Sequence, residues 1–134
     1  MASDHRLLGA ALNVADLRRS TDFYTHVFGM KEINRYETGE MTEVFMKWRE
    51  DDETALVLVV HGGGEAPSED RRGYGRTIIQ VPDAAAAVAR IREAGGTAGD
   101  AQDVLVESLG VNMVIALAHD PDGYMLELVQ DKNA

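Results

Sequence analysis

The 134-residue sequence has no cysteine, which removes several kinds of chemistry at once. The chain can form no disulfide, thiol nucleophile or thiolate metal site, so any metal ion would have to be held by nitrogen and oxygen atoms. The absence of disulfides fits a reducing cytoplasm, which is where we expect the protein. Long hydrophobic runs are also missing, since no apolar stretch approaches the roughly 20 residues needed to cross a bilayer.

Positive charge is scarce. The sequence has 13 Lys and Arg residues against 23 Asp and Glu residues, which gives a formal net charge of -10. Such an acidic surface repels nucleic-acid phosphates and anionic lipid headgroups, so we expect neither nucleic acid nor a membrane as a partner. The partner that we expect is a small-molecule ligand. The hydrophobic content of 45% is sufficient for one globular domain with its own core.

The two halves of the sequence resemble each other. In each half an alternating apolar run predicts a strand, an aspartate follows at a helix N-cap, and a glycine ends the helix. The matching residues are Leu12 and Ile79, Val14 and Val81, Asp16 and Asp83, and Gly29 and Gly96. Similar closing strands, at residues 55–60 and 124–129, end the two halves. The repeat therefore predicts two copies of a strand, helix and three-strand module.

The element bounds follow from local periodicity. Apolar residues at helical spacing predict helices at 16–28 and 83–94. Alternation predicts further strands at residues 31–36, 42–49, 54–61, 103–107, 111–118 and 124–130. The glycine-rich, charged stretch Gly62–Arg72 predicts a linker. A single domain, residues 1–134, would then consist of a first module (6–62), the linker (62–72) and a second module (73–130).

Two motifs accompany the repeat. They read Val14-x-Asp16-Leu17-x-x-Ser20-x-x-Phe23-Tyr24 and Asp120-Pro121-Asp122-Gly123-Tyr124-x-x-Glu127-Leu128. This pattern resembles the vicinal oxygen chelate superfamily of glyoxalases, bleomycin-resistance proteins and extradiol dioxygenases, and within it glyoxalase I. The stretch Arg72-Gly73-Tyr74-Gly75 also matches eukaryotic glyoxalases. The resemblance implies an α+β fold in which two βαβββ modules form a glyoxalase-like barrel, completed in a homodimer that shares each site.

The resemblance also locates a metal site. In glyoxalase I four positions supply ligands drawn from His, Gln and Glu, and they map to Gly9, Leu58, Arg76 and Glu127. Only Glu127 keeps a ligating side chain, since Gly9 and Leu58 offer no donor atom and the fixed charge of Arg76 repels a cation. Open zinc sites use three protein ligands, so we expect no bound metal and no other cofactor. The alternative is that His5 or His61, on the same two strands, rebuilds a site.

Arg76 and Glu127 are the candidate catalytic residues. Strand alternation directs both into the predicted cup, where they are expected to form an ion pair. Arg76 would bind a ligand carboxylate or enolate oxygen in place of the metal, and Glu127 would remove a proton next to a carbonyl as general base. The alternative is a purely structural salt bridge that fills the vacated site.

The candidate substrate-binding residues lie around this pair. On the first strand Gly9 and Asn13 share a face of small side chains that leaves room for a ligand. Leu58 lies on a strand of the first module, and Tyr74 shares a strand face with Arg76 in the second module. Arg72 matches the position that contacts glutathione in eukaryotic glyoxalases, which leaves glutathione open as a co-substrate. The family's other arginine for this ligand is Asn13 here, which argues against glutathione.

Three functions are consistent with these residues. The first is a glyoxalase I-like lyase or isomerase that acts without a metal on a small carbonyl compound or its thiol conjugate. The second is a non-catalytic binding protein of the bleomycin-resistance type, whose acidic dimer would trap a cationic ligand. The third is a dimeric scaffold with no open pocket. We favour the first, because residues 72–75 and 120–128 match glyoxalases best.

Overall fold

The computed structural model describes residues 8–38, 40–62, 74, 76–106 and 110–132. His5, Arg72 and most of the predicted linker fall outside these residues. The chain divides into two compact units, one of residues 1–25 and 29–67 and the other of residues 26–28 and 68–134. Within the described ranges, neither helix has the length and apolar character needed to span a membrane.

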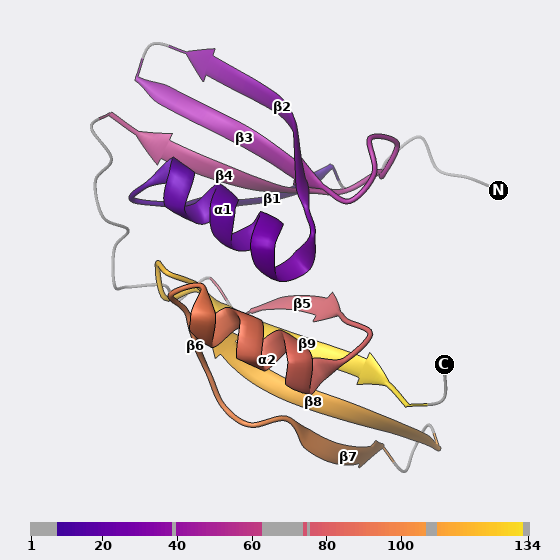
Figure 1. The fold of residues 1–134 in the computed structure, drawn as a ribbon. Coiled ribbons are helices and arrows are strands. Elements are labelled where there is room, and N and C mark those ends of the chain that lie inside the picture. Colours follow the sequence, from indigo (N-terminus) through magenta and orange to yellow (C-terminus); the bar gives the residue numbers. More distant parts are fainter. Residues whose placement is uncertain (1–7, 39, 63–73, 75, 107–109, 133–134) are drawn as a thin grey trace, which may run out of the picture. The chain divides into compact units, whose positions relative to one another are not determined.

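The first unit has one helix and one sheet (Figure 1). Its elements are β1 (Gly9–Asn13), α1 (Leu17–Phe28), β2 (Lys31–Thr38), β3 (Met41–Lys47) and β4 (Ala55–His61). The four strands lie in the order β1-β4-β3-β2. The β1–β4 pair is parallel and the other pairs are antiparallel. This is the predicted order of strand, helix and three strands.

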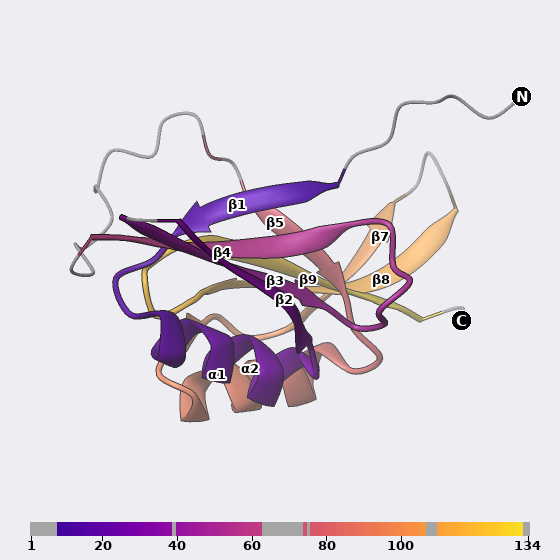
Figure 2. The same cartoon turned by 90° about the horizontal axis from the view of Figure 1, so that it is seen from above.

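Helix α1 begins and ends where the sequence signals predict. The Asp16 carboxylate accepts a hydrogen bond from the Arg19 backbone N–H at 3.1 Å, and Gly29 ends the helix with a left-handed φ of 73°. Figure 2 shows α1 along one side of the first sheet. The core of this unit is formed by buried side chains of the helix and of the sheet: Phe23 and Tyr24, with Leu12, Val44, Met46 and Leu58.

The second unit repeats the arrangement with one added strand (Figure 1). Its elements are β5 (Thr77–Gln80), α2 (Ala84–Glu93), β6 (Thr97–Ala98), β7 (Gln102–Val106), β8 (Val111–His119) and β9 (Met125–Asp131). The strand order is β5-β9-β8-β6, and β7 also pairs with β8. The β5–β9 pair is parallel, as β1–β4 is. Strand β6 was not predicted, because two residues are too short to show an alternating pattern.

The predicted α+β fold of two βαβββ modules is confirmed. The sequence-derived helices and strands lie within two residues of the observed ones. Each sheet is open at both edges, so the described residues contain no closed barrel. Closure of a barrel and its completion in a homodimer stay predictions.

Candidate functional site

Glu127 lies in the centre of the second sheet, on the face that its buried neighbours leave free. Leu126 and Leu128 are fully buried, so Glu127 points to the opposite side. The strand register places Glu127 between Ile78 of β5 and Leu117 of β8. These flanking residues are 59% and 49% exposed, whereas the Glu127 side chain is only 17% exposed. A carboxylate in this partly dry, apolar row requires a polar partner.

Arg76 is that partner. Its Nε–H donates to Oε1 of Glu127, so the ion pair predicted from the sequence is confirmed. Arg76 precedes β5 and is two residues from Ile78, which places both on the Glu127 face. The Arg76 side chain is 46% exposed. A guanidinium has five N–H donors, and this contact uses the one on Nε, so the terminal nitrogens can bind a ligand oxygen.

A pocket of about 280 Å³ opens on the same face of the sheet. It is lined by Gly99, Asp100, Gln102, Val104, Ile115 and Leu117. Leu117 is both a wall of the pocket and the cross-strand neighbour of Glu127. An apolar pocket with a few polar groups and an adjacent ion pair is typical of a small-molecule site. The scaffold hypothesis, in contrast, predicts no open pocket.

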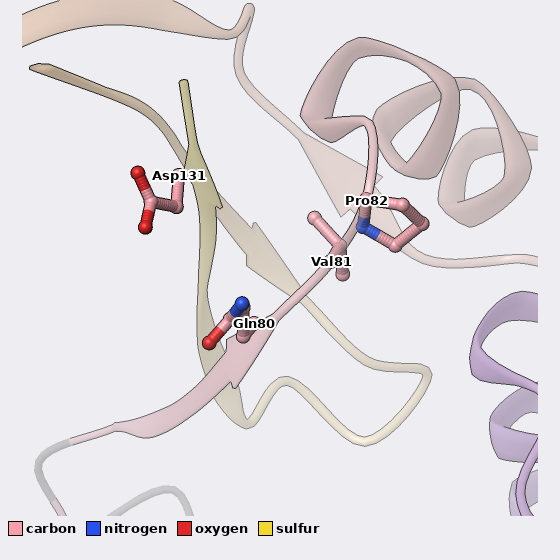
Figure 3. Close-up of a pocket in the computed structure, with 4 residues that line it drawn as sticks. All are labelled: Gln80, Val81, Pro82 and Asp131. Atoms are coloured by element: carbon pink, nitrogen blue, oxygen red, sulfur yellow. The ribbon is translucent and has the colours of Figure 1, made fainter. Parts of the chain in front are cut away.

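A second pocket, of about 450 Å³, lies at the far end of β5. Figure 3 shows Gln80 and Asp131 projecting to the same side of strands β5 and β9, with Val81 and Pro82 beside them. None of the predicted site residues lines this pocket. We therefore assign the candidate site to the ion pair and the Leu117 pocket.

Tyr74, a predicted substrate-binding residue, makes hydrogen bonds and a ring contact with other residues of its own unit. Its hydroxyl donates to the Met125 backbone carbonyl and accepts from the Thr77 hydroxyl, each at 2.8 Å. Its ring makes an edge-on contact with Tyr124, with centroids 5.1 Å apart. Burial raises the pKa of Tyr74 above its ordinary value of 10.0, because the charged phenolate would lose water. These contacts anchor the start of β5, and a role in substrate binding stays a prediction.

The first sheet brings Gly9 and Asn13 to one face, as predicted. They alternate with buried Leu12 and lie opposite Ala55 and Val59 of β4. At the end of this face the Asn13 Oδ1 atom lies 3.0 Å from His61 Nε2. Both side chains are exposed, so this hydrogen-bonded pair is accessible to a ligand.

Leu58 lies on the opposite face of the first sheet from Gly9. Its register partner is Leu12, and the Leu58 side chain is 0% exposed. Alternation in the sequence correctly groups Leu58 with Leu56 and Val60. The sequence does not fix the register between β1 and β4, and this register decides which face Leu58 occupies. The structure therefore separates Leu58 from Gly9.

The four mapped metal positions do not provide a ligand set. Gly9 has no side chain, Leu58 is buried on the other face of its sheet, and the Arg76 cation already binds the remaining carboxylate, Glu127. A divalent ion needs three or more converging donors. Across the ranges that the structure describes, no three His, Asp or Glu side chains are grouped to hold one. His61 contacts Asn13 instead.

The sequence-based reasoning missed the Leu117 pocket. Its walls come from β7, β8 and the segment before β7, which the register of Gln102 with Ile115 brings together. One signal was present in the sequence. Ile115 and Leu117 alternate with Ala116 and Ala118, which places two large side chains on one face and two small ones on the other.

Comparison with known proteins identifies the class to which this fold and site belong. The Glyoxalase/Bleomycin resistance protein/Dioxygenase superfamily matches residues 6–128, so the chain belongs to that superfamily. Within it, a lactoylglutathione lyase of Escherichia coli O157:H7 is 36% identical over 135 residues, covering 96% of this chain and 95% of the relative. The glyoxalase resemblance of the motifs is thereby confirmed.

Solved structures of the same superfamily also resemble this chain. The trypanothione-dependent glyoxalase I of Leishmania major is 31% identical with a TM-score of 0.74, covering 97% of this chain and 89% of that one. TnmS3, an antibiotic-binding protein from Streptomyces sp. CB03234, gives a TM-score of 0.71 over 98% of this chain and 99% of its own. Its 21% identity shows likeness of fold alone.

Proposed function

We propose that this protein is a glyoxalase-type lyase or isomerase that acts on a small carbonyl compound, or its thiol conjugate, without a bound divalent metal. The observation that carries the proposal is the Arg76–Glu127 ion pair, which lies at two of the mapped metal positions and beside an open apolar pocket. The lactoylglutathione lyases among the relatives support the reaction class.

Arg76 and Glu127 divide the chemistry between them. Terminal N–H groups of Arg76 bind the carbonyl oxygen of the substrate. Glu127 takes a proton from the adjacent carbon, and the electron pair of that C–H bond moves onto the carbonyl to form an enediolate, which Arg76 stabilises. Glu127 then returns the proton to the former carbonyl carbon, while the proton of the hydroxyl on the other carbon moves to the former carbonyl oxygen. The carbonyl and hydroxyl groups thereby exchange places, atoms and electrons balance, and no oxidant is needed.

The magnitude of the electrostatic contribution predicts a slow enzyme. A metal ion supplies several kcal/mol of charge stabilisation to such a transition state. One guanidinium that also binds a carboxylate supplies less, so we expect turnover well below that of metal-dependent glyoxalases. The Leu117 pocket contributes binding of the apolar part of the substrate, which orients it toward the ion pair.

The assembly belongs to the same proposal. We expect a homodimer with two equivalent sites, each shared between chains, and no nucleic-acid or membrane partner. A monomer in sedimentation equilibrium at micromolar concentration would contradict this assembly.

The test is turnover of the hemithioacetal of methylglyoxal and glutathione, and of methylglyoxal alone, in buffer containing a chelator. Arg76→Met and Glu127→Gln should each reduce kcat/KM at least about 100-fold, because oxyanion stabilisers and general bases contribute on this scale. Arg35→Met is the matched control, since it removes an exposed ion pair with Glu32 on β2, and neither residue belongs to the ion pair or the pocket assigned as the site. Near-stoichiometric nickel or zinc in the purified protein, lost in Glu127→Gln, would refute the metal-free mechanism.

One observation favours a second function, which is sequestration of a cationic ligand without chemistry. The Leu117 pocket carries Asp100 at its edge and lies beside Glu127, in a chain of net charge -10. A thermal shift assay with cationic aromatic drugs tests this function. A saturable rise in Tm, together with no turnover of either glyoxalase substrate, would favour binding over catalysis.

A further inference from the structure

Gly9, the first mapped metal position, has no space for a side chain. A Cβ atom at this position would lie 2.2 Å from the carbonyl oxygen of Ala55 and 3.1 Å from its carbonyl carbon. Non-bonded heavy atoms pack at about 3.5–4.0 Å, so a side chain would push β1 away from β4 by roughly 1 Å. Gly9 does not have a positive φ. Lack of space, and not backbone conformation, therefore requires glycine here.

Strand β1 is held against β4 on both sides of this contact. The Ala55 N–H donates to the Leu8 carbonyl and the Val14 N–H donates to the Val59 carbonyl, each at 2.8 Å. The parallel register runs without interruption between these bonds. A displacement of roughly 1 Å would stretch the nearer bond beyond hydrogen-bonding distance.

Position 58 has a different obstacle, which is its direction. Leu58 pairs with Leu12, and both are buried on one face of the sheet. Gly9 pairs with Ala55. Gly9 is three residues before Leu12 in β1, and an odd separation along a strand places two side-chain positions on opposite faces, so Gly9 lies on the other face. Ligands of one ion must converge to about 2.0–2.3 Å from it. Side chains at 9 and 58 point apart and do not converge.

From these two observations we infer that backbone geometry, and not only residue identity, closes the mapped metal site. Ligand side chains reintroduced at positions 9 and 58 would not rebuild a divalent-ion centre in this chain. The inference rests on the proposed metal-free function, because it uses the metal positions that were mapped for that proposal. Positions 9 and 58 then supply no metal ligand, and the charged groups of the proposed mechanism are Arg76 and Glu127 alone.

A pair of identical substitutions tests the steric part. Gly9→Ala should lower the Tm by about 5–10 °C, as expected for overpacking against backbone. Gly99→Ala is the matched control, because its added Cβ would meet only the Leu117 carbonyl oxygen at 3.8 Å. Gly99→Ala should leave the Tm unchanged or slightly raised. Hydrogen exchange of the Ala55 amide should accelerate at least about 10-fold in Gly9→Ala, with little change at Val14. A Gly9→Ala protein as stable as the control would overturn the inference.

A metal-binding experiment tests the functional part. The double variant Gly9→His/Arg76→His retains Glu127 and so presents three potential ligands on the strands mapped to the metal site. After incubation with nickel or zinc and desalting, we expect less than about 0.1 equivalent of metal and a Tm at least as low as that of Gly9→Ala. One equivalent of metal bound by a folded double variant would overturn the inference. Metal in the unmodified protein would instead refute the proposed function, so the two failures are distinguishable.

Discussion

Arg76→Met should destabilise the protein more than Glu127→Gln, although both substitutions remove the same ion pair. The difference follows from burial, since the Glu127 side chain is 17% exposed and that of Arg76 is 46% exposed. Without Arg76, a carboxylate stays between Ile78 and Leu117 with little access to water. Loss of the partner of such a charged group costs about 1–3 kcal/mol. Without the Glu127 charge, Arg76 keeps much of its hydration and can still donate to a glutamine oxygen, so the cost is about 0–1 kcal/mol.

Urea unfolding at pH 7 measures this difference as a change in midpoint at constant m-value. The double variant Arg76→Met/Glu127→Gln should be more stable than Arg76→Met alone, because it no longer contains the unpaired carboxylate. High salt should weaken the pair only in part, since screening acts most strongly on exposed charges. Glu127→Gln as damaging as Arg76→Met would refute this account of the site. It would mean that the cost of breaking the pair does not come from leaving a poorly hydrated carboxylate without its partner.

Three further predictions concern single side chains. Because burial raises the pKa of Tyr74 above 10.0, the folded protein holds this proton more tightly than the unfolded chain does. The resulting stabilisation is fully present below pH 10 and is lost as the pH rises through the raised pKa. The free energy of unfolding in urea should therefore vary less between pH 9 and 11 for Tyr74→Phe than for the unmodified protein. Asp120 is 3% exposed and accepts from two backbone N–H groups, so Asp120→Ala should cost about 2–3 kcal/mol in the same assay, and the exposed Asp100→Ala less than about 0.5. Leu117→Ser should raise KM several-fold, whereas Leu105→Ser, with a similarly exposed leucine outside the pocket lining, should not.

Local signals in the sequence predicted the elements because each acts over a few residues. Asp16 and Asp83 both cap helices through their carboxylates, and alternation located the strands. The Arg76–Glu127 pair was also predictable. The resemblance maps both residues to positions that line one cup, and alternation directs each side chain to one face of its own strand, where the paired strands β5 and β9 bring them together.

What the sequence did not reveal depends on the register between strands distant in the sequence. A shift of one residue between β1 and β4 would exchange the faces of Leu58 and Gly9 relative to each other, and nothing local in either strand encodes that shift. The same applies to the Leu117 pocket, which exists because Gln102 and Ile115 are paired across β7 and β8. The Arg76–Glu127 pair was therefore predictable, but the separation of Leu58 from Gly9 and the formation of the Leu117 pocket were not.

Gly9 shows how one residue type can have two physical explanations with opposite consequences. Read from the sequence, a glycine on the ligand face leaves room for a ligand or marks a lost metal ligand. In the structure, the space that a side chain would need is taken by the Ala55 carbonyl oxygen. Where a glycine only leaves room, mutation can restore a ligand side chain. Where close backbone approach requires the glycine, a side chain fits only if the sheet rearranges. On the inference drawn from Gly9 and Leu58, the backbone of the first sheet keeps positions 9 and 58 from supplying metal ligands, and substitution of these side chains alone would not change that.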